Sequence, residues 1–292
     1  MERALARAAR LLRAEPKLGA GFAIVATSLF LAVLGPALAP YDPLSSGVGL
    51  PLAPPSSTNW LGTDRLGMDI FSRLIAGARV DVLIALLAAA LATLFGTALG
   101  LLTGYRSNRL TDALVRLSDL LKSFPVFVLA MLAVVATGHN VGNLVFVLAF
   151  LNTPVFHRLM HAQTLYLRSS TFVEAARVAG SRDARILYRH ILPNALGLIF
   201  AEFSIVMGHG MLLVASLSFI GAGVKVPTPE WGSMIAIGAV SIMEGGHWWP
   251  SVFPGLALTI TVLGYAIVGD VLHRLTDPKR RDYVSLAPSP PG

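Results

Sequence analysis

The chain has 292 residues, of which 54% are hydrophobic and only 13% are charged, and its formal net charge is +7. An ordinary soluble domain carries about a quarter charged residues, so this composition excludes a soluble domain and indicates a helical membrane protein. The sequence contains no cysteine, which excludes disulfides and thiolate metal sites. A net positive charge is also typical of nucleic-acid-binding proteins. The positions of the charges along the chain therefore have to distinguish a membrane protein from a nucleic-acid-binding protein.

The N-terminal part combines a basic segment, residues 1–17, with an uncharged run. Residues 18–38 carry no charge and are long enough to cross the bilayer at about 1.5 Å per residue. The small-x-small triplet at 37–39 also suits a signal-peptide cleavage site, but the run exceeds the roughly 7–15 apolar residues of a signal. We therefore expect a retained first transmembrane helix over residues 18–39. The basic residues before it, expected on the anionic inner leaflet, are Arg3, Arg7, Arg10, Arg13 and Lys17.

Residues 40–79 are polar and punctuated by proline, glycine and serine, which predicts an external, partly irregular loop. We expect one short helix within it, over residues 68–76. The acidic residues of the loop raise the alternative of a calcium site, but they lack the spacing of an EF-hand. Two motifs stand out here, WLGTD at residues 60–64 and GMDIFSR at residues 67–73.

Three further apolar runs follow. Residues 82–102 form an uncharged second span, and the basic stretch at 105–122 is expected on the cytoplasmic side. The shorter runs at 123–137 and 141–156 each contain one proline, which we expect to interrupt the helix. Such helices in transporters flank the translocation pathway, although prolines are also simply commoner in membrane helices than in soluble ones. The two prolines are Pro125 and Pro154.

The only long charge-rich run set deep inside the apolar chain is FVEAARVAGSRDARILYRHILPN, residues 172–194. Glu174 opens a short helical turn, and Gly180 suits a bend that needs φ > 0. A second amphipathic segment reaches Pro193, where a helix can start but should not continue through. Taken alone, this run is a cytoplasmic loop that obeys the positive-inside rule. Its positive face consists of Arg177, Arg182, Arg185 and Arg189.

The fifth span, residues 194–220, contains two ionisable side chains, Glu202 and His209. An ionisable group within a span costs on the order of 2.5–3.5 kcal/mol in the worst cases, so it should face a cavity or a partner. Glu202 has three candidate roles: contact with a cationic solute, a structural hydrogen bond to a neighbouring helix, and pairing with the basic loop. Together with Asn143 and Asn152, these two residues form our candidate lining of a translocation path.

A second external loop, residues 221–249, leads to a sixth span at residues 252–272. Asp270 near its inner end precedes Arg274 by four residues, which predicts a local ion pair. On this layout the inner segments hold 19 of the 23 lysines and arginines, as the positive-inside rule demands of six helices with both ends cytoplasmic. The positive residues therefore flank the membrane spans and do not gather on one soluble face, which argues against nucleic-acid binding.

The sequence lacks common motifs of hydrolysis and metal binding. Without a Gly-x-x-x-x-Gly-Lys-Ser/Thr loop, the chain itself should neither bind nor hydrolyse ATP. It also lacks Gly-x-Ser-x-Gly and His-Glu-x-x-His, so we assign no catalytic residue. His157 and His161 can share one helical face in a metal relay, but no third ligand lies nearby, and we assign no metal site.

The charge-rich run resembles the EAA loop of permease subunits of ABC importers, in which Glu-Ala-Ala is followed by a glycine and a closing Leu-Pro. The RHILPN ending at 189–194 and both external-loop motifs are similar to the dipeptide, oligopeptide and nickel branch, where position 68 usually holds Arg and this chain has Met68. In that family the loop is a coupling helix that docks into a cleft of the ATP-binding subunit. The coupling residues that the resemblance implies are Glu174, Ala175, Ala176, Gly180, Leu192 and Pro193.

The resemblance implies an all-α membrane protein with six transmembrane helices and both termini cytoplasmic, the type I ABC importer (MetI-like) permease fold. Implied partners are a second homologous permease, one or two ATP-binding subunits holding MgATP, an extracytoplasmic substrate-binding protein and membrane lipid, with no nucleic acid. The chain itself would bind no cofactor and lie in the cytoplasmic (inner) membrane of a bacterium or archaeon. Peptides, nickel complexes, opines and glycosides all remain open as the solute.

The expected organisation has five parts. A basic cytoplasmic segment (1–17) and the first transmembrane helix (18–39) precede the external loop (40–79). A five-helix permease core (80–273) contains the cytoplasmic coupling loop (160–194), and a cytoplasmic tail (274–292) ends the chain.

Two rival functions remain to be weighed. The first is a proton-coupled secondary transporter, in which Glu202, Asp270 and the histidines would form the relay. Against it, no inverted repeat is evident, and six helices are few for such a carrier. The second is a membrane-anchored structural protein, which leaves the arginine-rich hairpin unexplained.

Overall fold

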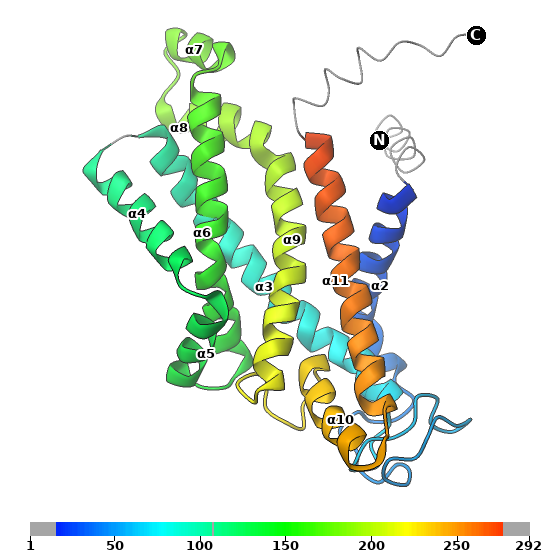
Figure 1. Cartoon of the computed structure of the whole chain (residues 1–292). Coiled ribbons are helices and arrows are strands. Elements are labelled where there is room, and N and C mark those ends of the chain that lie inside the picture. Colours follow the sequence, from blue (N-terminus) through cyan, green and yellow to red (C-terminus); the bar gives the residue numbers. More distant parts are fainter. Residues whose placement is uncertain (1–15, 107, 277–292) are drawn as a thin grey trace, which may run out of the picture.

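A computed structural model of the chain describes residues 16–106 and 108–276 (Figure 1). Every regular element in these ranges is a helix, and the only β-type pairing is an isolated antiparallel bridge between Thr63 and Asp69. The all-α prediction is therefore confirmed for this part of the chain. Most of the predicted basic segment and cytoplasmic tail, residues 1–15 and 277–292, lies outside the described residues.

Five helices are long and apolar enough to cross a membrane. They are α2 (Pro16–Leu38), α3 (Ile70–Tyr105), α6 (Val141–Arg168), α9 (Leu192–Phe219) and α11 (Trp249–Thr276). A sixth span is formed if α4 (Arg109–Ser123) and α5 (Val126–Thr137) are counted together, and these two are bent by 95° at the break between them. Pro125 is the N-cap of α5, so the predicted interruption at this proline is confirmed.

Four shorter elements lie at the two ends of the spans. They are α7 (Thr171–Val178), α8 (Asp183–Ile186), the π-helical turn η1 (Leu187–Ile191) and α10 (Trp231–Gly245). Figure 1 shows α7 and α8 at the same end as the start of α2 and the end of α11. Helices α5 and α10 and the long loop after α2 lie at the opposite end.

The start of α3 differs from the prediction. Residues 70–76 are not a separate short helix but the first turns of a 36-residue helix, so the external loop ends at Asp69, ten residues earlier than expected. The Asp69 carboxylate accepts a hydrogen bond from the backbone N–H of Ser72 (2.8 Å) and caps the helix. Arg79, which suggested a loop, donates to the carbonyls of Ala32 (2.9 Å) and Val33 (2.6 Å) at the end of α2.

Helix α6 also differs from the prediction, because Pro154 lies within it and does not interrupt it. The amide of Asn152 donates to the carbonyl of Leu148 (2.9 Å), and the hydroxyl of Thr153 donates to that of Ala149 (2.8 Å). Pro154 itself is buried, and packing against neighbouring helices lets a membrane helix continue through a proline. As a result residues 157–168, which we assigned to the approach of the coupling loop, belong to the span.

The second external loop is not irregular throughout, since it contains α10. Both carboxylate oxygens of the buried Glu230 cap this helix, accepting from the N–H groups of Gly232 (2.8 Å) and Ser233 (2.7 Å). The N–H of Trp231 donates to Asp81 on α3 (3.1 Å). These contacts fix α10 against the external end of the bundle.

Helices α3 and α6 pack with their backbones close together along a stripe of three glycines spaced four residues apart, Gly96, Gly100 and Gly104. A Cβ added at Gly100 would lie 2.5 Å from the Cβ of Met160 and 2.7 Å from the carbonyl oxygen of His157. Small residues in such a stripe are what allows membrane helices to approach closely. The stripe leaves no room for a side chain.

We expect Gly100→Ala to lower the stability of the protein, because the added methyl overpacks the α3–α6 contact at a cost of about 1–3 kcal/mol. The matched control is Gly255→Ala on α11, where an added Cβ meets nothing within 4 Å. Thermal unfolding in detergent, followed by circular dichroism, should show a lower midpoint for the first variant alone. Equal midpoints in the two variants would contradict the packing argument.

Candidate functional site

The charge-rich run folds into a hairpin at one end of the bundle, with α7 as its first arm (Figure 1). Gly180 follows α7 with φ +76°, and its N–H bonds to the carbonyl of Arg177 (3.0 Å), while the N–H of Ser181 bonds to that of Ala176 (3.0 Å). This pair of bonds is a Schellman motif, which requires a left-handed residue at the glycine position. The predicted bend at Gly180 is confirmed.

The underside of the hairpin is packed firmly on the spans. Val173, Ile186 and Ile191 are fully buried and belong to one cluster with Leu101 of α3 and Met160 of α6. Polar contacts add to this packing, as the hydroxyl of Tyr105 donates to Asp183 (2.8 Å) and Arg168 donates to the carbonyl of Gly104 (3.2 Å). The hairpin is therefore a rigid extension of α3, α6 and α9.

The outward face of the hairpin carries charge and two large apolar side chains. Val178 is 90% exposed and Tyr188 is 67% exposed. Glu174 and Ala175 are exposed on α7, whereas Ala176 is half-buried against the cluster below. None of the four arginines of this face forms an ion pair within the described ranges. Apolar side chains among unpaired arginines are typical of a protein-docking surface.

Leu192 and Pro193 lie at the base of the hairpin and not on its exposed tip. The backbone remains helical from Asp183 to Phe219, because the π-helical turn η1 accommodates the proline. In this turn the N–H of Leu192 bonds to the carbonyl of Leu187, five residues earlier. Such π-turns inside helices are often found at functional sites. Pro193 thus starts α9 as expected, but it joins hairpin and span without a break.

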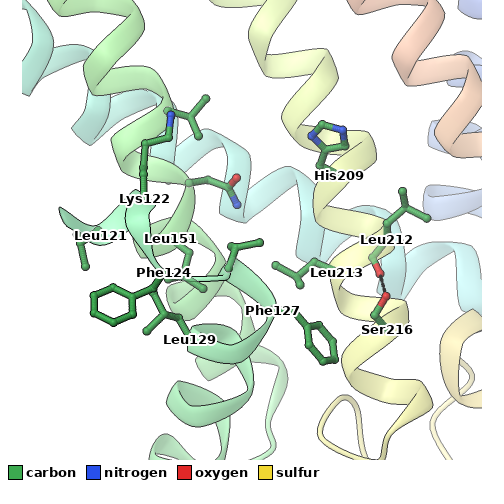
Figure 2. Close-up of a pocket in the computed structure, with 13 residues that line it drawn as sticks. Leu121, Lys122, Phe124, Phe127, Leu129, Leu151, His209, Leu212, Leu213 and Ser216 are labelled. Carbon is green, nitrogen blue, oxygen red and sulfur yellow. Dashed lines mark hydrogen bonds between the residues drawn. The ribbon is translucent and has the colours of Figure 1, made fainter. Parts of the chain in front are cut away.

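A cavity of about 450 Å³ lies between the α4–α5 bend, α6 and α9 (Figure 2). Its lining is mostly apolar, and Figure 2 shows Lys122 and His209 on opposite sides. The amide of Asn152 and the hydroxyl of Ser216 complete the polar lining. An apolar cavity with a few convergent polar groups is the usual form of a small-solute site.

Of the four predicted path residues, the structure brings Asn152 and His209 together at this cavity. Asn143 lies elsewhere, where its amide donates to the carbonyls of Thr137 and Gly138 and closes the turn between α5 and α6. Glu202 is half-buried on the face of α9 that carries His209, two turns nearer the hairpin, but does not line the cavity.

Lys122 is the residue that sequence reasoning missed, because we assigned it to a cytoplasmic stretch. Its place depends on the 95° bend that follows it, which turns the end of α4 towards α6 and α9. The available signal was a charged residue two positions before Phe124–Pro125, where an apolar run begins.

The two histidines of α6 form part of a hydrogen-bond network between helices. The ring of the buried His157 contacts the hydroxyls of Thr103 (2.9 Å) and Ser118 (2.6 Å), and that of His161 contacts the hydroxyl of Thr103 (3.0 Å). No group of three metal-binding side chains occurs within the part of the chain that the structure describes. The pair therefore ties α3, α4 and α6 together.

The external-loop motifs build a compact cap at the other end. Asn59 donates to the Asp69 carboxylate (2.9 Å), and the Asp64 carboxylate accepts from the N–H groups of Leu66 (2.9 Å) and Met68 (3.0 Å). Met68 itself accepts through its sulfur from the buried Arg73 (2.9 Å). These carboxylates are used in capping, which argues against the calcium alternative.

The chain is similar to a known protein family and to individual proteins within it. Residues 96–282 match the family model described as "Binding-protein-dependent transport system inner membrane component". The probable D,D-dipeptide transport system permease protein DdpC of Escherichia coli (strain K12) is 34% identical over 269 residues, covering 92% of this chain and 90% of that protein.

Two further relatives are permeases of the same kind. The glutathione transport system permease protein GsiD of Pectobacterium atrosepticum is 38% identical over 239 residues, which is 82% of this chain and 76% of that protein. The dipeptide transport system permease protein DppC of Alkalihalophilus pseudofirmus is 33% identical over 261 residues, with coverage of 89% and 85%. Such permeases are transport components and not catalytic subunits, and the match does not support the proton-coupled alternative. The chain belongs to the family of binding-protein-dependent transport system inner membrane components and is a multi-pass inner-membrane permease subunit of an ABC importer.

Proposed function

We propose that the hairpin of residues 171–193 is the surface through which an ATP-binding subunit drives this permease. The observation that carries the proposal is the contrast between its two sides. Val178 and the arginines are exposed on the outer side, while Val173, Ile186 and Ile191 are buried on the inner side. A surface of this kind can receive a partner and pass its movement to the spans without deforming.

The proposed coupling residues have different roles, according to their positions in the hairpin. Glu174 and Ala175 face outward on α7 and would contact the partner, where alanine permits close approach. Gly180 holds the angle of the hairpin, and Pro193 with the π-turn joins it rigidly to α9. Helix α9 also carries His209 of the cavity, so a push on the hairpin would move the cavity wall.

The cavity would be this subunit's half of the translocation path. A second permease of similar fold would supply the facing half, and an extracytoplasmic substrate-binding protein would deliver solute at the external cap. MgATP would be held by one or two ATP-binding subunits, with no cofactor on this chain. The hairpin end would be cytoplasmic together with both termini, since α2 starts and α11 ends there (Figure 1).

The proposed solute is a small peptide or a peptide-like molecule. Support comes from the relatives, which are named for D,D-dipeptide, glutathione and dipeptide transport. The polar groups of the cavity lining, an ammonium, an amide and an imidazole, can hydrogen-bond to the carboxylate and carbonyl oxygens of such a solute.

Gly180→Leu should leave the amount of protein in the membrane unchanged but abolish uptake of a labelled dipeptide, because a side chain at φ +76° strains the bend that sets the hairpin angle. Gly246→Leu is a closely matched control. That residue has φ +71°, and an added Cβ meets nothing within 4 Å at either glycine, but Gly246 lies at the external end of α10. Equal loss of uptake in both variants would count against a coupling role.

Glu174→Arg should reduce the ATP-binding subunits that co-purify with the tagged chain by about tenfold or more, because it reverses the charge at an exposed position of the proposed docking surface. The control is Glu244→Arg, an exposed glutamate at the external end that pairs with Arg65 (2.6 Å), which should leave co-purification unchanged. If both variants retain their ATP-binding subunits and their uptake, the hairpin is not the docking surface.

A further inference from the structure

Lys122 places a positive charge beside the cavity at mid-membrane depth. Asn152 and His209, which line the same cavity, stand about 16 Å and 15 Å from the external ends of α6 and α9 at 1.5 Å per residue. The hydrocarbon core is about 30 Å thick, so the cavity lies near its middle. An ammonium at such a depth has to face water or a ligand.

Lys122 forms no ion pair within the part of the chain that the structure describes. Among the 13 described residues that line the cavity, Lys122 is the only lysine, arginine, aspartate or glutamate. It is exposed, and no ion pair or hydrogen bond from its ammonium is found within residues 16–106 and 108–276. The cavity therefore presents one positive charge to whatever occupies it.

A second cavity of about 550 Å³ lies nearer the hairpin end, and Lys122 lines both cavities. On α6, Asn152 lines the first cavity, whereas Arg158 and His161 line the second. Asp119 is the only acidic residue in the second lining, against Lys122 and Arg158. The two cavities together thus favour an anion.

We propose that Lys122, supported by Arg158, binds the anionic group of the transported solute, which is the carboxylate in the case of a peptide. This inference rests on the proposed translocation path and names the chemical group that the path selects. An ammonium offers three donors, and hydrogen bonds between an ammonium and a carboxylate are stronger than those between neutral groups.

The absence of cysteine allows a direct test with a single reporter. Asn152→Cys would be introduced in the assembled importer, whose partner subunits are also made free of cysteine. The rates of modification by an anionic sulfonatoethyl and a cationic trimethylammonioethyl methanethiosulfonate would then be measured and normalised to a free thiol. We expect the anionic probe to be favoured, and Lys122→Gln to lower the ratio by about tenfold because one nearby charge acts oppositely on the two probes.

Three controls separate this effect from a structural one. Lys122→Arg should keep the ratio, because it keeps the charge. Lys225→Gln, which removes an exposed lysine from the second external loop, should not change the ratio at position 152. A Ser57→Cys reporter in the first external loop should give a ratio that Lys122→Gln does not alter.

Several outcomes would overturn the proposal. The ratio could be the same with lysine and glutamine at position 122, or neither probe could reach Cys at position 152 in the assembled importer. A loss of anion preference on adding phosphatidylglycerol to phosphatidylcholine vesicles would assign the site to a lipid headgroup. Because labelling requires neither docking through Glu174 nor dipeptide uptake, its failure is distinguishable from failure of the proposed function.

Discussion

The close contact between α3 and α6 is the packing interaction on which the rest of the structure depends. Gly96, Gly100 and Gly104 bring the two backbones together, and His157 and Thr103 add hydrogen bonds that also hold α4 through Ser118. The hairpin packs on the hairpin-side end of this helix pair, and the cavity is formed on the face of α6 that α3 does not cover. The proposed coupling surface and the proposed solute path are therefore both attached to the same helix pair.

Movement can pass from the hairpin to the cavity because helical backbone connects them. From Asp183 to Phe219 the chain contains no loop, because the π-turn at Leu187–Ile191 lets the helix continue through Pro193. A flexible joint at this place would absorb a displacement of the hairpin. The continuous helix would instead carry the displacement to His209, which is the geometry that the proposed rigid-body mechanism requires.

Much of the fold could be predicted from the sequence, because the bilayer sets the length of a span and excludes unpaired charge. The spans, the bend at Gly180 and the Asp270–Arg274 ion pair (2.8 Å) follow from local rules. The start of α3 could not be predicted, since Arg79 is satisfied by carbonyls of α2 that are distant in sequence. The position of Lys122 beside the cavity could not be predicted either, because it depends on the angle between α4 and α5 and on the positions of two other helices.

The distribution of charge distinguishes groups that hold the fold from groups that are free to act. Arg79 and Asp81 lie within a span, and each bonds to the backbone of another element. Lys122, Arg158 and Glu202 also lie within spans, yet none has an ion-pair partner in the described part of the chain. A charge kept at membrane depth without a protein partner lowers stability unless water or a ligand solvates it. For Lys122 and Arg158, which line cavities, the proposed passage of an anionic solute accounts for the unpaired charge.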